Sequence, residues 1–409
     1  MSDPATTRLP AAFRRLGWSN FIAQFAEQIA LAASPLVAVL VLAAGPVETG
    51  WLQAAQTLPF LLLSIPAGLL ADRWSRPLLM VGAETVRATS LVLTLTLLGA
   101  GMLNLPVLAL LGLLGATGTV CYSVAAPALV PSLVPRTRLG DANRWLELAR
   151  SAAYTGGPAV GGSLVGWIGA SPAFALATML SALAVLFLAG IGEPPRVARP
   201  DRKLLRDLSE GMAFVASHVL LRPILVTAVV FNVSWFVLQA VFVAYAVQNL
   251  GMDATTVGAI LGVYGVGMVA GALVAPMIAR HLNFGTLIVI GPLAGACAAL
   301  LLALTIWLPA GPLAGLSFFL FGAGPILWTI TTTTLRQAVT PDAMLGRVSA
   351  LLMTATFGAR PLGAALGGFV AAGFGVNACL IVAATGFVLQ LVLICASAVP
   401  GLRQLPDAV

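Results

Sequence analysis

Long apolar segments recur along the whole chain, and they limit its possible folds more than any other feature. A helix needs about 20 apolar residues to cross the hydrocarbon layer of a membrane. The 409 residues are 59% hydrophobic and 9% charged, which is too little polar surface to cover a soluble globule. We therefore predict an all-α integral membrane protein of twelve spanning helices, over residues 18–43, 50–72, 77–100, 104–131, 143–169, 172–191, 223–249, 255–279, 286–308, 312–335, 346–372 and 375–398.

The charges predict the orientation of these helices. Basic residues are retained on the cytoplasmic side of a membrane. If the N-terminus is cytoplasmic, the predicted outer loops carry only Glu48 and Asp253, and cytoplasmic segments carry Arg8, Arg14, Arg15, Arg73, Arg76, Arg136, Arg138, Arg196, Arg199, Arg202, Lys203, Arg206, Arg222, Arg280 and Arg403. We expect both termini in the cytoplasm of a bacterial cell, with the protein in the inner membrane. The net charge of +7 then reflects this orientation and not a nucleic-acid partner.

An internal repeat predicts the domain organisation. Residues 135–140 (PRTRLG) align with 341–346 (PDAMLG), and the same offset of 206 residues aligns 157–162 (GPAVGG) with 363–368 (GAALGG). We predict six-helix bundles over residues 1–191 and 223–409, joined by a cytoplasmic linker over 192–222. The amphipathic stretch 204–219 predicts a short surface helix in that linker, with a merely disordered linker as the alternative. Small residues at these spacings also predict close helix packing at Gly157, Pro158, Gly161, Gly162, Gly363, Gly367 and Gly368.

Three motifs resemble a known transporter family. The turn at 68–76 (GLLADRWSR) resembles the Gly-x-x-x-Asp-Arg-x-Gly-Arg-Arg/Lys signature of the major facilitator superfamily, although Ser75 replaces the usual Gly and Pro77 the usual base. The 157–162 element resembles the Gly-Pro-x-x-Gly-Gly element of exporters in that superfamily. Residues 336–347 are similar to a loop of the bacterial branch that includes the enterobactin exporter and drug-efflux proteins. The resemblance implies a twelve-helix secondary transporter that works by alternating access, and it favours export.

Charged residues on the cytoplasmic side predict a gate. The resemblance implies that Asp72 and Arg73 help to hold the inward side shut. Charges three residues apart on a helix can pair along one face, and such pairs occur near this turn. We interpret them mainly as a gate network, with direct substrate contact as the alternative; the further members are Arg76, Glu84, Arg87, Arg144, Glu147, Arg150 and Arg347.

Glu27 is the candidate for proton coupling. It shares a polar face of the first helix with Asn20 and Gln24, and its distance from the cytoplasmic end is about 14 Å at the helical rise. A carboxyl group near the bilayer midplane is costly unless it has a function or a partner. We expect Glu27 to bind and release a proton, with a Glu satisfied by a neighbouring helix as the alternative.

Amide and aromatic residues in the spans are candidates for a substrate cavity. Aromatic rings beside a few polar groups suit large amphipathic molecules, but aromatic residues in spans more often pack or face lipid. Arg360 has no acid in its own helix, so it either meets an acid from another helix or favours an anionic substrate. The full set of candidates is Gln24, Tyr122, Asn232, Trp235, Gln239, Trp328 and Arg360.

These features favour a transporter over an enzyme. The two His residues lie in predicted cytoplasmic segments, and the sequence has no phosphate-binding Gly-Lys-Ser/Thr loop. We expect no cofactor and no metal, and a monomer whose partners are a small-molecule substrate, protons and the lipid bilayer. The predicted function is proton-coupled export of an amphipathic small molecule such as a drug or siderophore. Alternatives are an importer or a lipid or metabolite transporter of the same fold, and, less favoured, a membrane sensor or a membrane enzyme.

Overall fold

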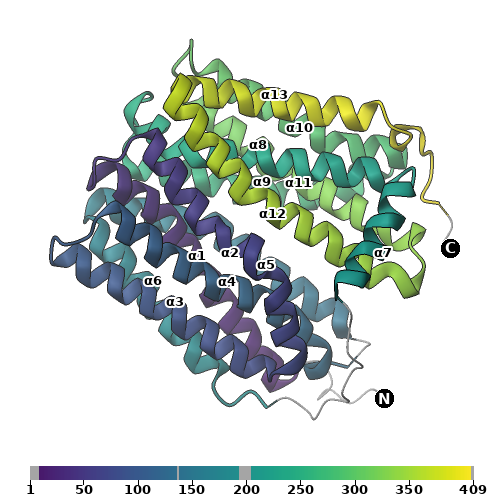
Figure 1. Cartoon of the computed structure of the whole chain (residues 1–409), viewed down its shortest axis with the longest axis horizontal. Helices are drawn as coiled ribbons and strands as arrows, with labels where there is room; N and C mark the ends of the chain where they lie inside the picture. Colours follow the sequence, from purple (N-terminus) through teal and green to yellow (C-terminus); the bar gives the residue numbers. More distant parts are fainter. Residues whose placement is uncertain (1–8, 136–137, 193–203, 407–409) are drawn as a thin grey trace. The chain divides into compact units, whose positions relative to one another are not determined.

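The structure is all-helical. The computed structural model describes residues 9–135, 138–192 and 204–406, and the side chains of 72, 140, 204–208 and 342–343 lie outside this description. Within these ranges Figure 1 shows long helices with short connections. The α-helices are α1 (Ala11–Leu40), α2 (Pro46–Arg73), α3 (Arg76–Gly99), α4 (Leu105–Leu133), α5 (Leu139–Trp167), α6 (Ala170–Leu188), α7 (Leu204–Ser217), α8 (Leu221–Gln248), α9 (Ala254–Ala279), α10 (Phe284–Leu304), α11 (Gly311–Val339), α12 (Asp342–Phe374) and α13 (Val376–Cys395), followed by a short 3₁₀ turn, η3 (Val399–Gly401).

Ten helices in the described part of the chain are long and apolar enough to cross a membrane. The other two predicted spans coincide with α5 and α12, which have sufficient length but fall outside this set. Both contain charges: α5 begins with an acidic and basic stretch that includes Glu147 and Arg150, and α12 contains Arg347 and Arg360. The apolar helices make this a multi-pass membrane protein, while the count of twelve spans stays a prediction.

The chain divides into two compact units. The first contains the described residues up to Ala44, those of Ala55–Val197, and Asp253–Gly262 at the start of α9. The second contains Gly45–Ala54 at the start of α2, the described residues of Ala198–Met252, and those from Val263 onward.

The same helix pairs pack in each unit. In the first unit α1 packs against α5 and α6, α3 packs against α4 and α6, and α5 packs against α6. In the second unit α8 packs against α12 and α13, α10 packs against α11 and α13, and α12 packs against α13. The sequence repeat therefore corresponds to a repeat of packing.

Glycines make the repeated packing possible. A Cβ built on Gly161 of α5 would lie 3.0 Å from the carbonyl oxygen of Ile29 in α1. A Cβ built on Gly367 of α12 would lie 3.0 Å from the carbonyl oxygen of Val237 in α8. Because each glycine lets backbone meet backbone, a larger residue would force the two helices apart.

The other glycines of the two elements lie at similar crossings. Gly157 contacts Gln28 of α1, and Gly363 contacts Val233 of α8. Within the first unit, a Cβ on Gly162 would lie 2.5 Å from the Cα of Gly258 at the start of α9. Within the second unit, a Cβ on Gly50 at the start of α2 would lie 2.6 Å from the Cα of Gly368. Pro158 lies inside α5 between two of these glycines.

The linker segment from Leu204 is helical and belongs to the second unit. α7 packs against α12 and α8. Val215 of α7 is fully buried in an apolar cluster that includes Leu335 and Val348. Gly211 lets α7 lie close to the backbone of α12. A Cβ built on Gly211 would lie 3.0 Å from the carbonyl oxygen of Arg347. α7 thus packs on two helices of the second unit, and its role as part of a linker stays a prediction; residues 193–203 lie outside the described residues.

Candidate functional site

Three charged side chains meet inside the first unit. Arg87 and Glu84 lie one turn apart on α3, and their ion pair is 2.6 Å long. The same guanidinium lies 3.4 Å from Oε2 of Glu27 on α1. Its Nη2 also donates to the carbonyl oxygen of Ala23 at 2.8 Å. The structure therefore joins the proton-coupling candidate to two residues that the sequence placed in a gate.

The two carboxylates differ in burial and in hydrogen bonding. Glu84 is fully buried and accepts hydrogen bonds from Arg87 at 2.7 Å and from Ser181 of α6 at 2.9 Å. The side chain of Glu27 is 21% exposed, and its distance from Arg87 is longer than that of the Glu84 pair. In a buried carboxylate with a short ion pair and a hydroxyl donor, the charge is compensated at close range. Glu27 is therefore the more exposed and the more distantly paired of the two carboxylates.

A hydroxyl pair contributes further polar groups from the same unit. The hydroxyl groups of Ser19 in α1 and Tyr122 in α4 lie 3.4 Å apart. Ser19 also donates to the carbonyl oxygen of Ala184 at 3.0 Å. Tyr122, a predicted cavity residue, is only 5% exposed, so its ring is part of the packed interior of this unit. Gln24 donates from Nε2 to Oδ1 of Asn20 at 3.1 Å along α1.

The remaining gate candidates make separate contacts. Arg76 donates to the carbonyl oxygen of Ala128 at 2.7 Å, which ties α3 to α4. Glu147 and Arg150 form a two-bond pair on the surface of α5, of which the shorter bond is 2.6 Å.

Arg144, Arg73 and Asp72 complete the predicted gate in the first unit. Arg144 and Arg73 are exposed. The side chain of Asp72 lies outside the described residues.

Arg347 is bound to the linker helix. Its Nη1 lies 2.5 Å from Oε2 of Glu210 on α7, within the second unit. An isolated surface pair stabilises little, but this one lies next to the backbone contact at Gly211 and the buried Val215. The contact therefore anchors the start of α12 to α7.

The cavity candidates of the second unit are mostly packed against neighbours. Trp235 is 9% exposed and lies against the rings of Tyr264, Phe318 and Phe321, with centroid distances of 5.4, 6.0 and 4.8 Å. Asn232 donates to the carbonyl oxygen of Ala228 at 2.9 Å. These contacts support packing as the role of Trp235.

The last three candidates are half-buried. Gln239 lies on α8, and Trp328 lies against Gly291 of α10. The guanidinium of Arg360 lies 4.2 Å from the ring centroid of Phe357 and 5.6 Å from that of Phe236. The positive charge of Arg360 is thus held over aromatic faces.

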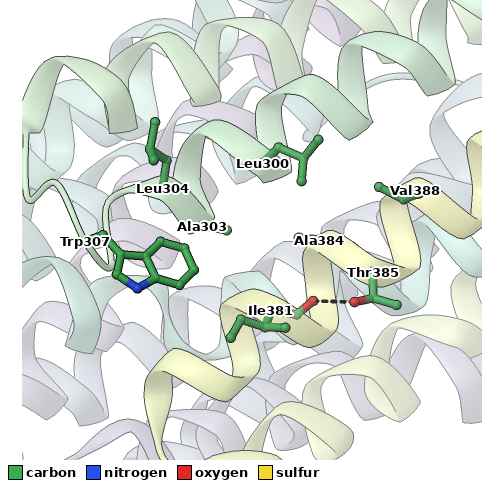
Figure 2. A pocket seen from close by; sticks show the side chains of 8 residues that line it. All are labelled: Leu300, Ala303, Leu304, Trp307, Ile381, Ala384, Thr385 and Val388. Atoms are coloured by element: carbon green, nitrogen blue, oxygen red, sulfur yellow. Dashed lines mark hydrogen bonds between the residues drawn. The ribbon is translucent and has the colours of Figure 1, made fainter.

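An apolar cavity in the second unit contains none of the predicted residues. It lies between α10 and α13 and has a volume of about 380 Å³. Figure 2 shows the side chains that line it. Its polar side-chain groups are the indole N–H of Trp307 and the hydroxyl of Thr385, which donates to the carbonyl oxygen of Ile381 at 2.8 Å. The lining residues are Leu300, Ala303, Leu304, Trp307, Ile381, Ala384, Thr385 and Val388. Since its lining is almost wholly apolar, with few polar groups to orient a substrate, this cavity is a poor transport site.

Two contacting residues were not predicted from the sequence. Ser181 is one of three hydroxyl residues in the apolar helix α6, with Ser171 and Thr178, and nothing in the sequence sets it apart from them. Glu210 could have been found, because it is an acid within the amphipathic stretch that was already expected to be helical.

Comparisons with known proteins agree with the helical architecture. The family model described as "Transmembrane secretion effector" matches residues 9–407. Among solved structures, the nucleoside transporter NupG (D323A mutant) matches with a TM-score of 0.78 at 13% identity, over 94% of this chain and 99% of that one. A D-xylose-proton symporter matches with a TM-score of 0.73 at 16% identity, over 94% and 97%.

Three curated relatives have higher identities. An uncharacterised MFS-type transporter, y4rN of Sinorhizobium fredii, is 29% identical over 80% of both chains. The multidrug efflux pump Tap of Mycolicibacterium fortuitum is 26% identical over 86% of this chain and 87% of its own. The enterobactin exporter EntS of Escherichia coli is 28% identical over 73% and 71%. The chain therefore belongs to the transmembrane secretion effector family of major facilitator superfamily transporters.

Proposed function

We propose that this protein exports an amphipathic small molecule across the bacterial inner membrane in exchange for protons. Export is supported by the similarity to a multidrug efflux pump and to an enterobactin exporter. The two predicted bundles would alternate in opening to either side, with both termini in the cytoplasm and the protein acting as a monomer. The gate on the cytoplasmic side would include Asp72 and Arg73.

The contact of Glu27 with Arg87 is the observation that carries proton exchange. Arg87 is already compensated by the buried Glu84, so protonation of Glu27 leaves a neutral pair behind. Loss of that proton adds a negative charge that Arg87 can attract at 3.4 Å. The two charge states of Glu27 therefore favour different positions of α1 relative to α3. A proton and a substrate that compete for Glu27 would couple their two fluxes.

Proton release from everted membrane vesicles tests this proposal. Vesicles with the wild-type protein should release protons when an exported compound is added, and a screen of drugs and siderophores would identify such a compound. Glu27→Gln removes the titrating group but keeps the shape and hydrogen-bonding capacity of the side chain. We expect this variant to fold, to abolish uphill transport and to lose the pH dependence of substrate binding.

Glu48→Gln is the matched control, because Glu48 is exposed at the start of α2 and its carboxylate accepts from the backbone of Gly45. It should transport like the wild type. Proton-driven transport by Glu27→Gln at near wild-type rates would contradict the role of Glu27. Uptake driven by the opposite gradient would instead show an importer.

A further inference from the structure

Arg336 is a half-buried arginine that takes part in none of the contacts described above. It lies in the last turn of α11, within the second unit. Its Nε is buried without a hydrogen-bond partner, and the described residues offer its guanidinium neither an ion pair nor an aromatic ring. The other half-buried or buried arginines have such contacts: for example, Arg76 binds a carbonyl oxygen, Arg87 binds Glu84, and Arg360 lies over aromatic rings.

A second unsatisfied group lies one turn further along. Thr340 follows Arg336 by four residues, so both lie on one side of the end of α11. Thr340 is 2% exposed, and its hydroxyl group has no hydrogen-bond partner among the described residues. A buried hydroxyl and a buried guanidinium nitrogen are costly unless something else completes their hydrogen bonds. An oxyanion would accept from both groups.

The length of α11 places these groups outside the hydrocarbon layer. Arg336 is 25 residues from Gly311, or about 38 Å along the helix at the usual rise. The hydrocarbon layer is about 30 Å thick, so a helix that begins at one boundary brings Arg336 to the headgroup level at the other. The phosphodiester is the abundant oxyanion at that level. A planar guanidinium can bind two oxygens of one phosphate, and a threonine hydroxyl can donate to a third.

We propose that Arg336 and Thr340 form a binding site for a phosphate group at the end of α11. The phosphate of an anionic membrane lipid and free inorganic phosphate share this chemistry. The site is independent of Glu27 and of transport, so its failure would leave the proposed function untouched.

The test measures thermal stabilisation of the purified, delipidated full-length protein by added phospholipid. We expect phosphatidylglycerol to raise the Tm more than phosphatidylcholine. In Arg336→Gln the additional rise should disappear, and the number of phosphatidylglycerol molecules retained in native mass spectrometry should fall by about one. Arg336→Lys should retain part of the effect, because the charge stays while the two-point contact is lost. Thr340→Val should weaken it without changing the net charge.

Arg222→Gln is the control for charge alone, since Arg222 is an exposed arginine in the first turn of α8. It should leave the difference between the two lipids intact. Inorganic phosphate would also be added to the protein in phosphatidylcholine. If it raises the Tm of the wild type but not that of Arg336→Gln, the site binds a soluble phosphate. An equal loss in Arg336→Gln and Arg222→Gln, or no response to either phosphate source, would overturn the proposal.

Discussion

At the scale of single residues, the ion pair between Arg87 and Glu84 makes the first unit sensitive to substitution. Among the described residues, Arg87→Met leaves the fully buried Glu84 with the Ser181 hydroxyl as its remaining hydrogen-bond donor. Removing one partner of a buried pair costs about 3–5 kcal/mol, because the remaining charge is uncompensated. We therefore expect a marked loss of thermal stability in detergent.

The double variant separates this charge effect from a loss of packing. In Glu84→Leu with Arg87→Met no buried charge remains in the pair, so most of the lost stability should return. Unfolding followed by intrinsic tryptophan fluorescence would measure Arg87→Met, Glu84→Leu and the double variant. Additive losses in the double variant would show that the two side chains act independently.

His218 predicts a pH dependence at the residue scale. It lies between α7 and α8, and its Nδ1 accepts from the backbone nitrogens of Leu220 and Leu221 at 3.2 and 3.3 Å. Burial lowers the pKa of His218 below its usual 6.5. The folded state therefore binds the proton less readily than the unfolded state, and stability rises with pH in this range.

The stabilisation from neutral His218 should be complete above pH 6.5 and be lost as the pH falls through the lower, folded-state pKa. Protonation also removes the acceptor at Nδ1, so the start of α8 loosens. We expect the Tm to decrease between pH 7.5 and 5.5 because of this group. His218→Asn keeps a backbone acceptor that does not titrate, so its Tm should fall less; an identical pH profile would contradict this role.

At the scale of elements, the sequence predicted helices better than it predicted their ends. The first helix begins at Ala11, earlier than the expected residue 18, because its charged first turns are also helical. Hydropathy indicates which residues lie in the membrane, but the hydrogen-bonded helix can begin several residues before them. The same reason explains why α5 begins at Leu139, before the predicted residue 143.

Contacts between helices were harder to predict from the sequence than the helices themselves. The sequence indicated that Glu84 and Arg87 pair, because their spacing fixes them on one face of a helix. The sequence allowed a neighbouring helix to satisfy Glu27, but nothing in it indicated that the contact is with Arg87, since the rotation of α1 against α3 depends on packing throughout the unit. Trp235 illustrates a related limit: an aromatic residue has the same spacing whether it faces a cavity or a packed core.

The role of α5 as a span gives a prediction at the element scale. Ten spans and twelve spans both place the two termini on one side, so the termini alone cannot distinguish these counts. Reporter fusions ending near residue 136 and after Gly169 lie on either side of α5. If α5 crosses the membrane, an alkaline phosphatase reporter should be inactive at the first site and active at the second. Equal activity at both would show that α5 does not span.

At the scale of the whole molecule, the charge distribution predicts the position of both termini. We expect green fluorescent protein fused after Val409 to fluoresce in cells, and alkaline phosphatase fused there to be inactive. A phosphatase fusion in the predicted outer loop near Leu308 should have the opposite behaviour. An active phosphatase at the C-terminus would invert the proposed orientation, and with it the direction of the everted-vesicle experiment.

The matched crossings at Gly161 and Gly367 have a consequence for how this sequence can change. Each lets α5 or α12 lie directly on the backbone of a partner, α1 or α8, and each excludes a side chain in the same way. Because the two units pack their helices in the same way, equivalent positions in the two units are under the same steric limits. Positions 206 residues apart in α5 and α12 should therefore resist or accept substitutions together, even where their present residues differ.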